Sequence, residues 1–77
     1  MRDELKGFIE AQILSGRAVA PEEDLLVSGL VDSLGVMRLV AFIENAFGLK
    51  VPARDLTLKN FRSVDAIAAY VAAKEEA

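Results

Sequence analysis

The sequence contains no cysteine and no histidine. Without cysteine, the chain forms no disulfide and offers no thiol for redox or metal chemistry. Without histidine, it lacks the usual general base, the usual zinc ligand and the base of a Ser-His-Asp triad. We therefore expect no metal site, no catalytic residue and no enzymatic activity.

Basic charge and long apolar runs are also scarce. Nine basic residues stand against twelve acidic ones, which gives a net charge of −3. This balance argues against nucleic acid as a partner. No apolar run approaches the roughly 20 residues that a membrane-spanning helix needs, and the charged start does not resemble a signal peptide. We expect a cytoplasmic protein without membrane insertion.

What the chain does contain is an apolar fraction large enough for a core. Hydrophobic residues make up 53% of the 77 positions. A chain of this length is near the lower size limit at which one core stabilises a domain without disulfides or a structural metal. We expect residues 1–77 to form a single domain and the protein to be a monomer.

Apolar residues recur at helical spacing in three segments. Residues 2–15 form the first segment, with Gly16 as its expected C-terminal cap, and residues 33–47 form the second, ended by Gly48. The third begins after Ser63, an expected N-cap, and a short turn capped by Thr57 precedes it. The core stripes of the three long helices are Leu5, Phe8, Ile9 and Ile13; Val36, Leu39, Val40, Ile43 and Phe47; and Val64, Ile67, Ala68 and Val71.

Residues 16–32 show no periodicity and are expected to form a long loop. Leu25, Leu26, Leu30 and Val31 predict that the loop packs onto the helices, whereas the acidic run 22–24 indicates a solvated face. Leu56, Leu58 and Phe61 are the expected anchors of the short turn, and Tyr70 is expected at the core edge with its hydroxyl in water. The predicted fold is an all-α four-helix bundle of three long helices and one short helix, with a long loop between helices one and two.

A second apolar line runs along the other side of helix 33–47. Leu34, Met37 and Ala41 occupy positions i, i+3 and i+7. The long loop could cover this line, or the line could be an exposed patch for a partner. The pattern leaves both possibilities open, and it does not place Phe42.

Asp32 and Ser33 stand where the loop turns into this helix. Asp and Ser are typical residues at helix starts, so a simple cap explains the pair by itself. The unpaired amides of the first turn and the helix dipole also favour negative charge there. A phosphate ester on Ser33 would therefore be stabilised, although Asp32 would repel it.

The order helix, long loop, Asp32-Ser33-Leu34, helix, short helix, helix resembles the acyl carrier proteins. The similarity covers nearly the whole chain. The matching residues are Gly29 to Gly35, Leu39, Glu44, Phe47-Gly48, Asp55-Leu56-Thr57, Phe61, Ser63-Val64, Ile67 and Tyr70-Val71.

The resemblance implies a specific function. A phosphopantetheinyl transferase would move 4′-phosphopantetheine from coenzyme A onto Ser33, within the motif of Asp32 and Leu34. The thiol of that arm would hold an acyl or aminoacyl group as a thioester. The expected partners are this transferase, a loading ligase, and acyl-transfer or condensing enzymes. They would dock on Leu34, Met37, Arg38 and Ala41.

One feature departs from the carriers of central fatty acid synthesis, which usually show several acids on the exposed side of helix two. That side here offers Gly35, Arg38 and Asn45, with Ala46 at a further position and Glu44 as the remaining acid. The motif looks closer to carriers of specialised pathways, including aminoacyl and D-alanyl carriers. A helical adaptor without a covalent group and a carrier-like domain regulated by phosphorylation of Ser33 remain alternatives.

Overall fold

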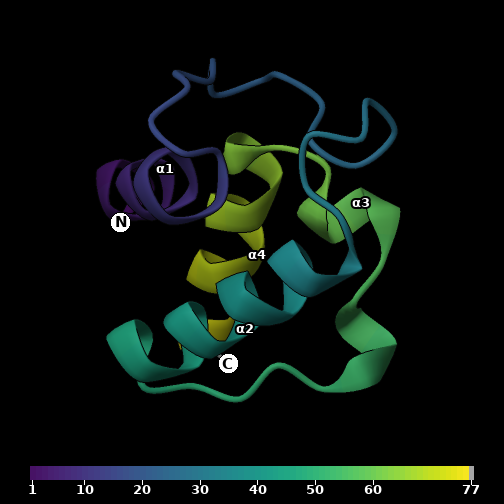
Figure 1. Ribbon diagram of the computed structural model, residues 1–77. Helices are drawn as coiled ribbons and strands as arrows, with labels where there is room; N and C mark the ends of the chain where they lie inside the picture. Colours follow the sequence, from purple (N-terminus) through teal and green to yellow (C-terminus); the bar gives the residue numbers. More distant parts are fainter. Residues whose placement is uncertain (77) are drawn as a thin grey trace.

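The fold is all-helical. The computed structural model describes residues 1–76, and within them there are four α-helices and no strand. The all-α prediction is confirmed (Figure 1). The elements are α1 (Arg2–Phe8), the π-helix η1 (Ile9–Ile13), α2 (Ser33–Phe47), the 3-10 helix η2 (Ala53–Asp55), α3 (Leu58–Phe61) and α4 (Val64–Glu76).

The first helical segment continues from α1 into the π-helix η1 and ends earlier than predicted. The Leu14 amide donates to the carbonyl of Ile9, five residues back, at 2.9 Å, which is the bond of a π turn. With this wider turn, Ile13 and Leu14 both pack partly against the core. Ser15 and Gly16 then take positive φ angles of 55° and 93°. Gly16 therefore lies beyond the cap, at the point where the chain reverses.

Both ends of α2 lie where the sequence predicted them. The extended Asp32 caps the start through its side chain. Gly48 ends the helix in the left-handed conformation, with φ of 65°, and its amide donates to Glu44. Of the predicted core positions, Leu39, Val40 and Ile43 are buried, whereas Val36 and Phe47 are only partly buried.

One hydrophobic core joins all four helices and the loop. Helix α1 packs against α2 and α4, and α3 packs against α4. Phe42, which the pattern did not place, stacks on Phe8 with ring centroids 4.3 Å apart. The largest fully buried side chains are Phe61, Leu5, Ile9, Leu25, Leu39, Ile43, Ile67, Val64 and Val71.

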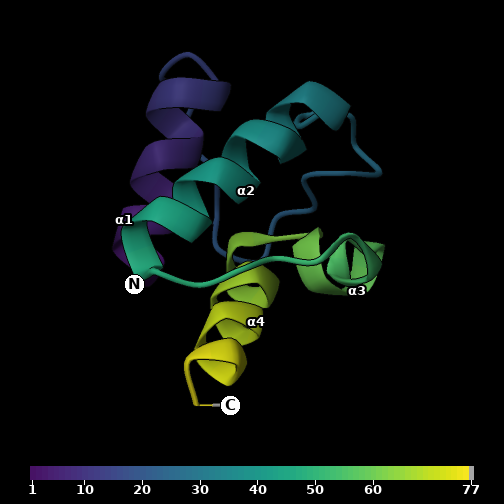
Figure 2. The same cartoon turned by 90° about the horizontal axis from the view of Figure 1, so that it is seen from below.

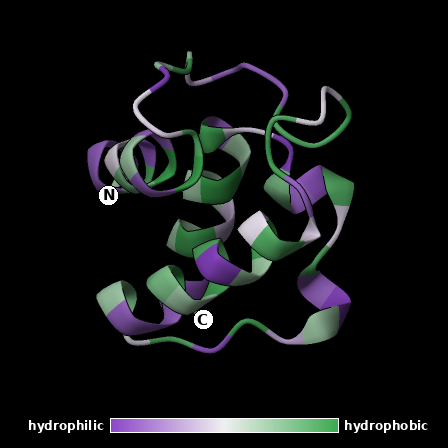
Figure 3. Cartoon of the chain, viewed as in Figure 1, coloured by the Kyte–Doolittle hydropathy of each residue, from purple (hydrophilic) through white to green (hydrophobic). Residues whose placement is uncertain are grey.

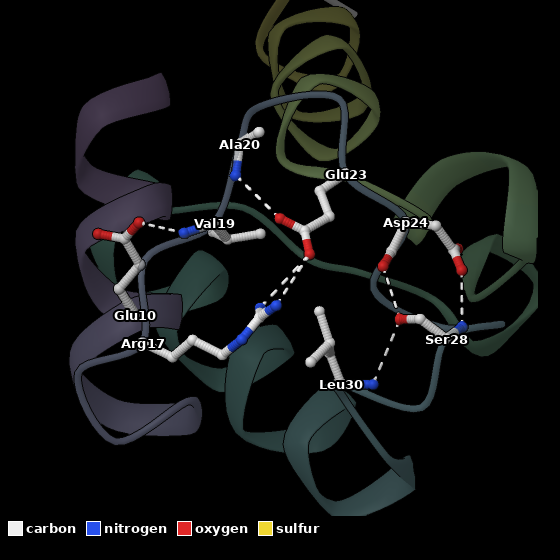
Figure 4. A network of polar contacts seen from close by, with 8 residues as sticks. All are labelled: Glu10, Arg17, Val19, Ala20, Glu23, Asp24, Ser28 and Leu30. Carbon is white, nitrogen blue, oxygen red and sulfur yellow. Dashed lines mark hydrogen bonds and ion pairs between the residues drawn. The ribbon is translucent and has the colours of Figure 1, made fainter.

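Residues 14–32 contain turns and bends but no helix. Hydrogen bonds from backbone amides to side-chain carboxylates fix the course of this loop (Figure 4). Glu10 accepts from the Val19 amide at 2.7 Å, and Asp24 accepts from the Ser28 amide at 2.6 Å. Glu23 accepts from the Ala20 amide and pairs with Arg17 at 3.4 Å. Glu23 and Asp24 of the predicted solvated face are therefore half-exposed and also fix the loop through backbone amides.

Backbone hydrogen bonds tie this loop to the start of α4. The Leu25 amide donates to the carbonyl of Arg62 at 2.6 Å, and the Asp65 amide donates to that of Pro21 at 2.9 Å. Figure 1 shows the loop crossing from the end of the first helical segment to the start of α2, and both views place α3 and the start of α2 on the side away from α1 (Figures 1 and 2). No helix within residues 1–76 is long and apolar enough to cross a membrane.

Gly35 is buried, although the sequence placed it on the exposed side of α2. A Cβ at this position would lie 2.9 Å from Cγ1 of Val31 and 3.3 Å from Cγ2 of Ile13. Only glycine lets the loop and the end of η1 approach the first turn of α2 this closely.

A hydrogen bond ties η2 to α4. The Tyr70 hydroxyl donates to Oδ2 of Asp55 at 2.6 Å, and Lys74 pairs with the same oxygen at 3.4 Å. Tyr70 lies at the core edge, as predicted, and its hydroxyl bonds a carboxylate of the chain, which the sequence did not indicate. The hydrogen bond from Tyr70 lowers the pKa of Asp55 below its ordinary value near 3.8. Burial and the bond to Asp55 raise the pKa of Tyr70.

We expect Gly35→Ala to lower the free energy of unfolding by about 1–2 kcal/mol. Overpacking of this kind typically costs about 1–3 kcal/mol, and the helix propensity of alanine returns about 1 kcal/mol at most. The matched control is Gly7→Ala in α1, where a Cβ would meet nothing within 4 Å. Gly7→Ala should raise stability by about 0.5–1 kcal/mol in urea unfolding. Equal effects of the two substitutions would contradict the close approach at Gly35.

We expect Tyr70→Phe to lower stability at neutral pH and to flatten its acid dependence. Because the pKa of Asp55 is depressed in the folded state, its contribution is complete above the unfolded pKa near 3.8 and is lost as the pH falls through the lower folded value. Urea midpoints of Tyr70→Phe and the parent should therefore converge as the pH falls through the depressed pKa of Asp55. A difference that stays constant from neutral to acid pH would show that the bond contributes nothing to this linkage.

Candidate functional site

Ser33 is the first residue of α2, and its neighbour Asp32 defines the start of that helix. Oδ1 of Asp32 accepts from the Gly35 amide at 2.8 Å, and the carbonyl of Asp32 accepts from the Val36 amide at 2.9 Å. Ser33 and Leu34 are exposed. The helix start therefore presents the Ser33 hydroxyl to solvent, at the end of α2 that favours negative charge.

A surface hollow of about 530 Å³ lies beside Ser33. Three segments form it: the end of the loop, the first turns of α2, and the residue that follows η2. Its volume is in the range of sites that bind small molecules, and most of its side chains are apolar. The lining residues are Leu26, Gly29, Val31, Asp32, Ser33, Val36, Met37 and Leu56.

The second apolar line of α2 is exposed, so the idea that the loop covers it is wrong. Leu34 is 69% exposed and Met37 is 58% exposed. Arg38 and Ala41, the other two residues expected on the partner face, are exposed as well. The four residues therefore share the accessible side of α2, and their contact with a partner stays a prediction.

Two further apolar residues are exposed that the sequence did not predict to be so. Val27 in the loop is 77% exposed, and Leu58 at the start of α3 is 51% exposed. Leu58 was expected to anchor the short turn in the core. In the four-residue helix α3, however, Phe61 is the buried residue. Of the three expected anchors, Phe61 and Leu56, which follows η2, pack in or against the core. Figure 3 shows hydrophobic ribbon in both the loop and α3 at this end.

Helix α2 carries little charge. Arg38 and Glu44 are its charged residues. Oε2 of Glu44 accepts from the Val51 amide at 2.9 Å, which holds the chain after Gly48 against the helix. The one acid that the sequence left on α2 is therefore occupied within the chain, and Arg38 is the exposed charge of this helix.

Comparison with known proteins places these features in a family. The model of the family described as "Phosphopantetheine attachment site" matches residues 8–71, which is most of the chain. The match begins in α1, includes the loop, Asp32, Ser33 and α2, and ends in α4.

Two individual proteins are similar. The D-alanyl carrier protein of Streptococcus uberis is 37% identical over 46 residues, which are 60% of this chain. The chain spans only 58% of the length of that relative. A solved chain from a structure described as "Crystal structure of FAD-dependent dehydrogenase" superposes with a TM-score of 0.81 at 30% identity. That alignment covers 87% of this chain and 97% of the solved chain.

The cofactor of this family is 4′-phosphopantetheine, held covalently. The structure offers what such a group requires. An exposed serine hydroxyl stands at a helix start that favours a phosphate, and an apolar hollow adjoins it. The residue types of the site and the extent of the match agree, and the chain belongs to the phosphopantetheine-attachment family of carrier proteins.

Proposed function

We propose that this chain carries an acyl or aminoacyl group on a 4′-phosphopantetheine arm attached to Ser33. When bound, the arm supplies a terminal thiol that can hold the group as a thioester. The observation that carries this proposal is the exposed hydroxyl of Ser33 at the start of α2, within the matched family region.

The other serines are less suitable as attachment sites. The Ser28 hydroxyl donates to the carbonyl of Asp24 at 2.7 Å. Ser63 is 5% exposed, and its hydroxyl caps α4 by accepting from the Ala66 amide at 3.1 Å. Ser15 follows the end of η1 with a positive φ and does not begin a helix. Ser33 makes none of these bonds and lies beside the hollow.

The residues around Ser33 position the attached group without reacting with it. Asp32 fixes the start of α2, and the first-turn amides stabilise a phosphate there. Val31, Val36 and Met37 line the hollow and give the arm an apolar surface to lie against. Since the chain has no histidine and no cysteine, loading and transfer belong to partner enzymes. The chain itself therefore acts as a carrier, not as a catalyst.

The cargo that we favour is D-alanine or another aminoacyl group. The similarity to a D-alanyl carrier protein supports this choice, although it covers only part of that relative. The charge of α2 supports it too, since Arg38 is exposed and Glu44 is bound to Val51. Such a surface lacks the acids that carriers of central fatty acid synthesis usually present on helix two.

A second candidate is delivery of the cargo to a flavin-dependent dehydrogenase. The solved structure that contains the 30% identical chain is described as that of an FAD-dependent dehydrogenase. In this second candidate function the attachment to Ser33 is the same, and the partner oxidises the cargo while the chain holds it. An oxidised form of the cargo on the chain from cells would favour this second candidate.

We expect coenzyme A and a broad-specificity phosphopantetheinyl transferase to add one phosphopantetheine to the unmodified chain. Intact mass spectrometry should show complete conversion of the parent and of the matched control Ser28→Ala, and no conversion of Ser33→Ala. Circular dichroism should show that Ser33→Ala is folded, because position 33 is exposed. Modification of Ser33→Ala, or failure of the parent to react, would overturn the proposal. In that case, the intact mass of the chain purified from cells would separate the alternatives. An added phosphate would favour regulation by phosphorylation of Ser33, and no added mass would favour a helical adaptor.

A further inference from the structure

The segment from α2 to α3 carries a charge opposite to that of the whole chain, whereas the adjoining Asp32, Glu22 and Asp24 of the loop are acidic. Residues 33–62, from α2 to the end of α3 and its cap, contain five basic residues and two acidic residues, a net charge of +3, whereas the chain carries −3. The basic residues of this segment are Arg38, Lys50, Arg54, Lys59 and Arg62. The negative charge of the protein therefore lies in α1, the loop and α4.

Both acids of this segment are occupied by groups of the chain. Glu44 accepts from the Val51 amide, and Asp55 is held by Tyr70 and Lys74. The ion pairs within residues 1–76 use Arg2, Lys6, Arg17, Lys74 and the amino terminus. In this part of the chain, the exposed cations Arg38, Arg54, Lys59 and Arg62 thus form no ion pair, and their charge is available to a partner.

Exposed apolar side chains lie among these cations. The large exposed hydrophobic residues of α2, the loop and α3 are Leu34, Met37, Val27 and Leu58. The hollow beside Ser33 joins α2 to the loop and Leu56, and a second hollow joins the loop to Leu58 and Arg62. Apolar patches with a polar rim are typical of protein interfaces. The last part of the loop, α3 and the start of α2 lie at one end of the molecule, away from α1, as both ribbon views show (Figures 1 and 2).

We propose that this end is the docking face for a partner enzyme whose contact surface is apolar at its centre and acidic where it meets α2, η2 and α3. The proposal rests on the proposed function, because the partner must reach the group on Ser33. The face is defined by Leu34, Met37, Arg38, Arg54, Leu58, Lys59 and Arg62.

Charge complementarity selects the sign of the partner surface. A basic partner would meet Arg38 on α2 and Lys59 on α3 with like charge, which costs affinity and slows encounter. An acidic partner would be steered to this end and repelled from the acidic remainder of the chain. Glu22 and Asp24 border the second hollow, so the partner carboxylates face α2 and α3 and not the loop edge.

The test uses two synthetic amphipathic helices with the same leucine pattern, one with glutamate and one with lysine on the polar face. Each is titrated into the isotope-labelled full chain and followed by amide NMR shifts. We expect the Leu/Glu helix to bind about tenfold more tightly than the Leu/Lys helix. Its shifts should cluster at the start of α2, η2 and α3. Added salt should weaken it, since exposed charges are screened beyond about 8–10 Å.

A matched pair of variants locates the effect. Arg38→Glu should abolish the preference for the Leu/Glu helix, whereas Lys50→Glu, with the same charge change, should leave it nearly intact. Lys50 follows the far end of α2, about 22 Å along the helix from Ser33. Both positions are exposed, and the same spectra show whether each variant is folded.

Several outcomes would overturn the proposal. They are tighter binding of the Leu/Lys helix, equal effects of the two variants, shifts confined to the acidic segment 1–24, or the same shifts caused by a single-stranded oligonucleotide or by raising the concentration of the chain alone. Because the titration needs no arm, its failure leaves the Ser33 assignment intact. Binding of the Leu/Glu helix by a chain that the transferase does not modify would contradict the proposed function alone.

Discussion

The hydrogen bond from the Gly35 amide to the Asp32 carboxylate is the contact on which the site depends. It sets the first residue of α2 and therefore places the Ser33 hydroxyl at the helix start. Because Gly35 has no Cβ, Val31 and Ile13 can pack against this turn, and Val31 forms a wall of the hollow. A serine one residue earlier would be the cap. A serine one residue later would be the second residue of the first turn, in a different relation to the amides.

The loop before Asp32 has no helical structure and is held by hydrogen bonds and by Val19, Leu25 and Val31, which are buried in the core. Carboxylates of Glu10, Glu23 and Asp24 accept backbone amides, and two backbone bonds hold the loop to the start of α4. These acids are thus used to shape the site. The exposed cations of α2, η2 and α3 form no ion pair within the described residues, so these three elements present positive charge beside an acidic loop.

The limits of α2 and the caps of α3 and α4 could be predicted because local chemistry decides them. Asp32, Thr57 and Ser63 accept first-turn amides, and Gly48 takes a left-handed angle. The misses depend on packing between distant segments. Burial of Gly35 requires the loop to approach α2, and the bond from Tyr70 to Asp55 spans 15 residues. The π-helix η1 changes the hydrogen-bond pattern without changing the apolar pattern, so periodicity could not reveal it.

The central claim is that Ser33 holds the carried group, and the most direct test is to read that group from the protein as cells make it. The chain should be purified without reducing thiol from its own producing cells and its peptides fragmented by mass spectrometry. We predict one phosphopantetheine on the peptide that contains Asp32 and Ser33, localised to Ser33 and bearing D-alanine or another aminoacyl group. A chain with a bare phosphate on Ser33, with the arm on another serine, or with no modification would contradict the claim.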